Sequence, residues 1–221
     1  MRDVVFGNNE IYHIFNRSLD QQPIFTLKRN CQRALLTLDF YRFKNPPLRL
    51  SKALLLEKEA RKKFFNNLKL NGEKLVEIVS YCLIPNHFHF LLKQRLDNGI
   101  AKFVGNFTNS YTRYLNTKSK RVGPFFQGTF KAVRIENEEQ LIHVSRYIHL
   151  NPVTSFVVKE ESLELYQYSS LPEFLGLSHE EICDKEVVLN FFSSKKKYRT
   201  FIYDQIDYAK KLEMIKHLAL E

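Results

Sequence analysis

The chain has 221 residues, with 34 Lys and Arg against 24 Asp and Glu, which gives a formal charge of +10. This length fits one domain with an extension, and the excess of positive charge favours a polyanionic partner, most often nucleic acid. The three cysteines are far apart and form no Cys-x-x-Cys pair, which argues against a disulfide framework or a zinc knuckle. No apolar stretch approaches the length of a membrane span, so we expect a cytoplasmic protein with no membrane partner.

The first third of the chain predicts one strand followed by helices. Residues 10–18, "EIYHIFNRS", are rich in aromatic and β-branched side chains and predict a strand. Apolar residues recur at helical spacing over residues 28–43. After "NPPLRLS" breaks this pattern with two prolines, a basic segment over about residues 52–70 predicts another helix.

Two short apolar segments follow and predict a pair of strands. They cover residues 75–83, "LVEIVSYCL", and residues 87–94, "HFHFLLKQ". Because the segments are short and are joined through Pro85 and Asn86, we expect either an antiparallel pair or one bent strand.

The next elements are a long helix, a strand and a second long helix. Residues 97–117 carry apolar side chains at helical spacing, and residues 129–136 alternate like a strand. Asn137 with Gln140 three residues later resembles a capping box, so a helix should start there and end at Pro152. The element order predicts an α+β fold in which helices pack on an antiparallel sheet.

The pattern weakens after about residue 161, and we divide the chain into two parts. Residues 1–175 form the predicted domain, and residues 176–221 form a C-terminal extension that should be helical. The last stretch, residues 207–220, is expected to be a terminal helix.

Two histidines inside an apolar strand need an explanation, because burying an imidazole is unfavourable unless it is paired or bound. Alternate residues of a strand point to the same face, so His87 and His89 project together while Phe88 and Phe90 pack on the opposite face. Two imidazoles about 6.5–7 Å apart along a strand can lean toward each other and share one metal ion. A lone histidine would more often be a hydrogen-bonded core residue, but a pair on one face favours a metal site.

Four segments together resemble a known family. "PNHFHFLL" is followed by "NSYTRYLN", "GPFFQGTFKAVRI" and "SRYIHLNPV", and this combination is similar to the single-tyrosine HUH transposases of bacterial insertion sequences, especially the branch of REP-associated tyrosine transposases. The resemblance runs from "YHIFNRS" to "YQYSSLPEFLG", which is most of the chain. It implies the ferredoxin-like or RRM-like HUH endonuclease fold. One departure is Thr129, which stands where related sequences usually have an arginine.

The resemblance implies a nuclease and strand transferase that acts on single-stranded DNA. In that family the two histidines bind a divalent cation and a tyrosine on a helix attacks a DNA phosphate, a role that carries over to Tyr147. The polar residue that completes the metal site carries over to Asn151. Relatives act either as dimers that exchange the tyrosine helix or as monomers, so we leave open whether this chain is a homodimer or a monomer.

The residue types fit this chemistry. Tyr147 and Asn151 are four residues apart, so they emerge on the same face of a helix. Oxygen ligands favour Mg²⁺ or Mn²⁺, and imidazole shifts the preference toward Mn²⁺. Attack by the phenol would give a 5′-phosphotyrosine and a free 3′-hydroxyl, and a second 3′-hydroxyl could reverse the step without ATP.

Basic and aromatic residues of the later segments are candidates for holding single-stranded or hairpin DNA. Lysines and arginines would contact phosphates, and phenylalanines would stack on unpaired bases. These candidates are Arg113, Lys118, Lys120, Arg121, Phe125, Phe126, Lys131 and Arg134.

Two other functions remain open. The first is a non-catalytic or domesticated regulator that binds single-stranded nucleic acid on the same fold, and the second is an RNA-binding module in which the His-x-His pair is structural. Tyr147 could be a core aromatic, as we expect of Tyr111 and Tyr114. We interpret His143 and His149 as structural residues or as residues that support the site without binding the metal. The presence of a nucleophile together with both histidines and Asn151 favours the enzyme.

Overall fold

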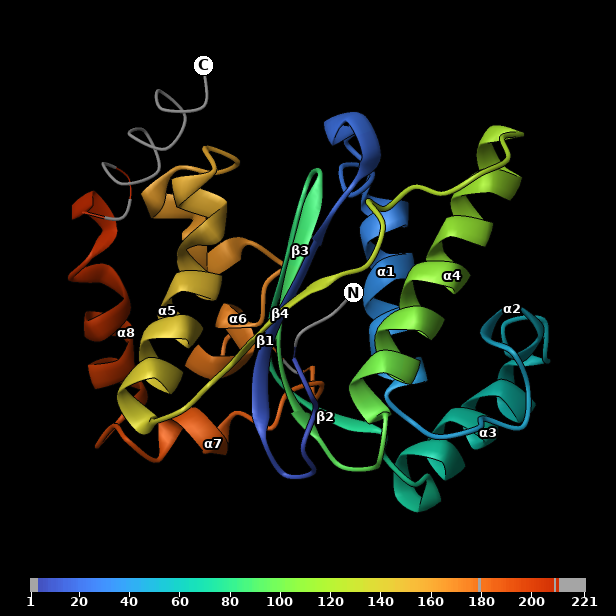
Figure 1. Cartoon of the computed structure of the whole chain (residues 1–221), viewed down its shortest axis with the longest axis horizontal. Coiled ribbons are helices and arrows are strands. Elements are labelled where there is room, and N and C mark those ends of the chain that lie inside the picture. Colours follow the sequence, from blue (N-terminus) through green and yellow to red (C-terminus); the bar gives the residue numbers. More distant parts are fainter. Residues whose placement is uncertain (1–3, 179, 209, 211–221) are drawn as a thin grey trace.

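The computed structural model describes residues 4–178, 180–208 and 210, and these residues form an antiparallel sheet covered by helices on both faces (Figure 1). The sheet has four strands in the order β2-β3-β1-β4. Their bounds are Ile11–Arg17 for β1, Val76–Ile84 for β2, His87–Gln94 for β3 and Lys131–Arg134 for β4. This architecture confirms the predicted α+β class, an antiparallel sheet with packed helices.

The two central strands fix which side chains share a face. Strands β2 and β3 form an antiparallel hairpin around Pro85 and Asn86, which confirms the antiparallel alternative. Strand β1 pairs with β3 so that Phe15 lies opposite His89 and Arg17 lies opposite His87. Because residues paired across antiparallel strands point to the same side, β1 and β3 together form one face that carries both histidines.

The opposite face of the sheet packs on α1 (Lys28–Tyr41) and α4 (Gly99–Ser119). Phe88 and Phe90 stack on each other at 4.3 Å between ring centroids, and Phe107 of α4 meets both edge-on. Tyr111 is fully buried and donates to the Ile24 carbonyl at 2.7 Å. The predicted core role of Tyr111 is therefore confirmed.

The basic segment after α1 folds as two helices, where we predicted one. Helix α2 (Leu50–Ala53) and helix α3 (Lys58–Asn71) are separated by a short turn. Their apolar residues pack with Phe40 and Phe43 as a small separate cluster.

The histidine face of the sheet packs on α5 (Glu138–Thr154). The side chain of Asn137 accepts a hydrogen bond from the Gln140 amide at 2.8 Å, as the predicted cap requires. The prediction that Pro152 ends this helix is wrong, because Pro152 lies inside the last turn. A proline there removes a single helical hydrogen bond, and its carbonyl still accepts from the amides of Val157 and Val158.

Residues beyond the predicted boundary at 175 pack beside α5. Short helix α6 (Leu171–Leu175) ends at Gly176, and α7 (Glu186–Leu189) and α8 (Lys195–Tyr203) follow on the same side of the sheet. The remaining short turns are η1 (Leu19–Gln21) and η2 (Glu160–Leu165). The terminal helix predicted over 207–220 lies outside the described residues from 211 on. Among the described helices, none has the length and apolar character needed to cross a membrane.

Candidate active site

The histidine pair of β3 lies directly beside the tyrosine of α5 in the same chain. The rings of His87 and His89 are 5.0 Å apart between centroids. The ring of Tyr147 stands edge-on to His89 at 5.4 Å, with an angle of 87° between the ring planes. Packing of α5 on the sheet therefore brings together three predicted site residues whose sequence positions are far apart.

These residues open into a cleft of about 480 Å³. The side chain of Tyr147 is 39% exposed, so its phenol is accessible, whereas Asn151 is buried in the cleft wall. Arg17 and Lys131 line the same cleft, and none of the described residues that line it is acidic. The cleft thus combines an accessible phenol, imidazoles and two cations, a combination suited to an anionic substrate such as phosphate.

Each histidine of the pair has a hydrogen-bond partner at Nδ1. His87 Nδ1 lies 2.6 Å from the amide oxygen of Asn86, and His89 Nδ1 lies 2.9 Å from Nε2 of His13 on β1. An amide oxygen only accepts, so His87 Nδ1 carries a proton, and in the neutral imidazole the lone pair is on Nε2. Such a partner commonly orients a histidine that ligates a metal.

The donor atoms suit a divalent ion bound by few protein ligands. The Asn151 amide nitrogen donates to the Tyr147 carbonyl at 3.1 Å, so its amide oxygen is the atom suited to ligate a cation. Within the described part of the chain, no cluster of three or more His, Cys, Asp or Glu could hold a metal. Any ion here would therefore depend on two imidazoles, an amide oxygen and oxygen atoms from substrate or water.

Comparison with known proteins agrees with this geometry. Residues 52–151 match the family model described as "Transposase IS200 like". This segment, 100 of the 221 residues, is similar to the IS200-like transposases. The matched residues include His87, His89, Tyr147 and Asn151 of the site, whereas β1 lies outside them.

One solved structure supports the fold described above. A REP-associated tyrosine transposase bound to a REP hairpin superposes with a TM-score of 0.55 at 12% identity, covering 82% of this chain and 88% of that one. A putative transposase from Deinococcus radiodurans R1 gives a TM-score of 0.35 at 13% identity, covering 67% and 93%, which is too low to support an argument. No functionally curated protein matches the chain.

Two residues that line or support the site were not among the predicted ones. His13 bonds to His89 and lies edge-on to Tyr147 at 5.9 Å between centroids, and Arg17 lines the cleft. Desolvation lowers the pKa of His13 to about 4, so this imidazole is neutral at neutral pH. The alternation of the strand over residues 10–18 placed His13 and Arg17 on one face, but only the pairing with β3 shows that they face the histidine pair.

A buried polar network connects helix α5 to Ser170 and to Tyr198 of α8. His149 bonds through Nδ1 to the Tyr198 hydroxyl of α8 and through Nε2 to Ser170 Oγ, each at 2.8 Å. The same Tyr198 hydroxyl lies 2.9 Å from Ser145 Oγ. Full burial lowers the pKa of His149 to about 3, which keeps it neutral. His149 is therefore structural, and it connects α5 to Tyr198 in the C-terminal extension.

The predicted stacking role of Phe125 and Phe126 is wrong. Each ring is only 7% exposed and belongs to the core under α4. Phe126 packs against Phe25, and the guanidinium of Arg121 covers Phe125 at 4.2 Å from its ring centroid. The loop folds inward because these rings can fill the gap between the sheet and α4, so neither presents a face to a DNA base.

The basic residues predicted to contact DNA lie in different parts of the molecule. Lys131 lines the Tyr147 cleft, Arg134 forms an ion pair with Glu10 at 2.8 Å, and Lys120 is exposed at the end of α4. Arg113 and Lys118 lie elsewhere, in a groove of about 760 Å³ between α1 and α4. Within the described chain, this groove is lined by no acidic residue and by five basic ones, Arg29, Arg33, Arg49, Arg113 and Lys118.

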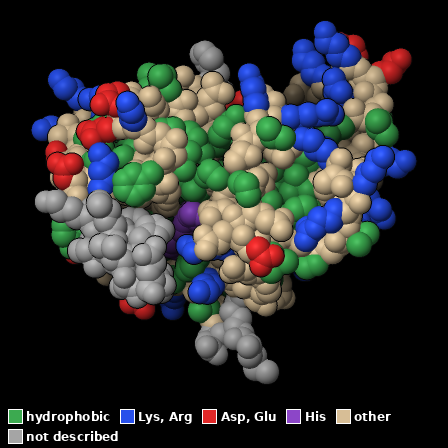
Figure 2. Space-filling model, turned by 90° about the horizontal axis from the view of Figure 1, so that it is seen from above, with side chains coloured by type: hydrophobic (Ala, Val, Ile, Leu, Met, Phe, Trp, Pro, Cys, Tyr) green, Lys and Arg blue, Asp and Glu red, His purple; other side chains and the backbone are tan. Residues whose placement is uncertain are grey.

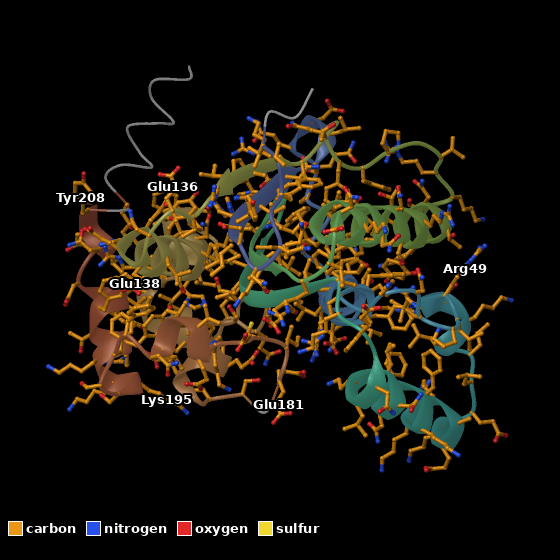
Figure 3. All side chains as sticks on the ribbon, turned by 60° about the horizontal axis from the view of Figure 1, so that its bottom comes forward. Arg49, Glu136, Glu138, Glu181, Lys195 and Tyr208 are labelled. Atoms are coloured by element: carbon orange, nitrogen blue, oxygen red, sulfur yellow. The ribbon has the colours of Figure 1, made fainter. Side chains whose placement is uncertain are left out.

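The figures show the groove side as strongly cationic. Figure 2 shows many Lys and Arg side chains over the α2–α4 side of the molecule, with histidine surface visible near the middle of this face. Arg49 lies at the outer edge of that side, whereas Lys195 and Tyr208 lie with α8 at the other (Figure 3). We therefore treat the groove, defined by its five basic residues, as a surface distinct from the cleft.

The network behind α5 generates a stability prediction. Tyr198→Phe removes the hydroxyl that bonds to His149 and Ser145 and leaves a buried imidazole nitrogen without this partner. We expect the free energy of unfolding to fall by about 1–3 kcal/mol, measured by urea denaturation. The matched control is Tyr208→Phe, which alters a side chain that is 63% exposed and should change stability by less than about 0.5 kcal/mol. Equal effects of the two variants would contradict a supporting role for the network.

Proposed function

We propose that the protein cleaves and rejoins single-stranded DNA through a covalent bond to Tyr147. The observation that carries this proposal is the exposed phenol beside the His87–His89 pair, in a cleft that also contains Arg17 and Lys131. The match of residues 52–151 to the IS200-like transposase model supports the same class of reaction. A protein that only binds nucleic acid gains nothing from an accessible phenol at this position.

The reaction needs two transesterification steps at phosphorus. Attack by Tyr147 Oη forms the Oη–P bond and breaks the P–O3′ bond, while the phenol loses a proton and the departing 3′ oxygen gains one. The products are a 5′-phosphotyrosine and a 3′-hydroxyl. Attack by the 3′-hydroxyl of another strand reverses these changes and releases the phenol, so the phosphoester is conserved and no nucleotide triphosphate is consumed.

The residues around the phenol would organise the phosphate. Arg17 and Lys131 supply positive charge in the cleft to attract and orient the DNA backbone. His87, His89 and the amide oxygen of Asn151 would hold a divalent cation, for which Mn²⁺ or Mg²⁺ suits the mixed nitrogen and oxygen donors. When bound, such an ion supplies Lewis-acid stabilisation of the charge that develops on the phosphate.

We propose that the groove between α1 and α4 contacts the phosphate backbone of the same DNA. A solved structure with this fold is a REP-associated tyrosine transposase bound to a REP hairpin, which makes hairpin DNA the natural candidate ligand. The five cations of the groove have no acidic neighbour in its lining among the described residues, so they can neutralise phosphates. Because Phe125 and Phe126 are buried and cannot stack on DNA bases, phosphate contacts would provide most of the affinity for DNA.

The covalent step can be tested with labelled hairpin oligonucleotides in Mn²⁺. Wild-type protein should form an adduct that resists SDS, whereas Tyr147→Phe should form none because it lacks the attacking oxygen, and it should bind the DNA within about twofold of wild type. Tyr208→Phe removes another exposed phenol and should leave the adduct intact. An adduct that persists in Tyr147→Phe would show that another group attacks. Tight binding by wild type without any adduct would support the non-catalytic regulator.

The groove predicts a salt effect that is separate from cleavage. Replacing both Arg113 and Lys118 by Gln removes two phosphate contacts, so the slope of log affinity against log salt should fall by about 1.4–1.8. The measurement is fluorescence anisotropy with hairpin DNA over a range of salt concentrations. The matched control replaces Lys195 and Lys196 by Gln, because these exposed lysines lie on α8 on the far side of the sheet. A slope that falls equally in both double variants would contradict a specific role for the groove.

A further inference from the structure

We propose that His13 is a positioning residue that sets the proton of His89. It accepts a hydrogen bond from His89 Nδ1–H and so holds the lone pair of His89 on Nε2. This inference rests on the proposed function, because it assigns His13 a role in preparing the histidine pair for a cation. His13 lies outside the segment that matches the IS200-like family model. The pairing of β1 with β3 is what brings it next to His89.

His13 reaches His89 diagonally across the two strands. Phe15 is the direct partner of His89, and His13 is the next residue on the same face of β1. The two imidazoles stack at 5.1 Å between centroids with 24° between their planes, and His13 Nε2 lies 2.9 Å from His89 Nδ1. Phe15 contacts both rings, at 5.0 Å and 5.6 Å, so the pair is held by packing as well as by the hydrogen bond.

The direction of the His13–His89 hydrogen bond decides which nitrogen of His89 can ligate a cation. The Asn86 amide oxygen accepts from His87 Nδ1, which puts the lone pair of His87 on Nε2. When both imidazoles are neutral, they share one hydrogen between the facing nitrogens, so His13 and His89 can be arranged in two ways. If His89 donates, both histidines of the pair carry their lone pairs on Nε2. If His13 donates, Nε2 of His89 carries a proton and cannot ligate a cation.

A direct ligand role for His13 is less consistent with the contacts. Its Nε2 is occupied by the hydrogen bond to His89, and the described residues contain no group of three or more His, Cys, Asp or Glu that could hold a metal. His13 also lies edge-on to Tyr147, so its ring packs against the ring of Tyr147. These contacts indicate a residue that acts through His89.

The test compares His13→Gln with His13→Leu in the full chain. The amide oxygen of Gln can reach a position near that of the lost Nε2 and accept from His89, whereas Leu fills space and accepts nothing. The first readout is the His89 tautomer, measured by long-range ¹H–¹⁵N correlation without metal. The second is Mn²⁺ affinity by titration calorimetry without DNA, and thermal unfolding without metal checks that each variant folds.

We expect the Nδ1–H tautomer of His89 in wild type and in His13→Gln, and its loss in His13→Leu. Mn²⁺ affinity should fall by about 10–100-fold in His13→Leu and recover most of this loss in His13→Gln. An Nε2–H tautomer of His89 in wild type would overturn the proposal, and so would a tautomer unchanged by His13→Leu. If wild type bound no Mn²⁺, the metal part of the proposed function would fail, while the tautomer comparison would still decide the role of His13.

Discussion

The pairing of β1 with β3 is the constraint on which the rest of the site depends. It places Phe15 opposite His89 and Arg17 opposite His87, so one face of two adjacent strands carries both histidines, His13 and a cation. A slip of one residue would turn β1 over and place Tyr12 and Ile14 on this face. Such a slip is strongly disfavoured because both side chains are buried in the core under α1 and α4. The burial of Tyr12 and Ile14 on one face of the sheet thus determines which side chains of β1 lie on the histidine face.

The second constraint is the position of α5. Its apolar residues pack on the sheet, and the hydrogen bonds of His149 fasten it to Ser170 and to Tyr198 of α8. A buried polar network specifies one arrangement when every member is satisfied, because each alternative leaves a desolvated group unpaired. Tyr147, two residues before His149, therefore meets the histidines of its own chain at a defined place. The C-terminal extension, which carries none of the proposed catalytic groups, takes part in positioning Tyr147, the proposed nucleophile.

The sequence predicted well the features that local patterns determine. Alternating side chains indicated the strands, helical spacing indicated α1 and α4, and the Asn137 cap indicated the start of α5. The errors concern features that depend on distant contacts. Pro152 stays within α5 because a proline in the last turn removes only one helical hydrogen bond. Phe125 and Phe126 turn inward because they pack in the core beneath α4. Similarly, no local pattern indicated that His13 meets His89, since their positions are joined only by strand pairing.

The central claim is that the phenol and the histidine pair of one chain form a single site, and mixing two inactive variants tests it most directly. Tyr147→Phe lacks the nucleophile, and His89→Ala lacks one member of the pair. The account predicts that each variant alone and their equimolar mixture cleave hairpin DNA no faster than background, while wild type remains active. Recovery of cleavage in the mixture would contradict it, because a complete site would then have formed from Tyr147 of one chain and His89 of another.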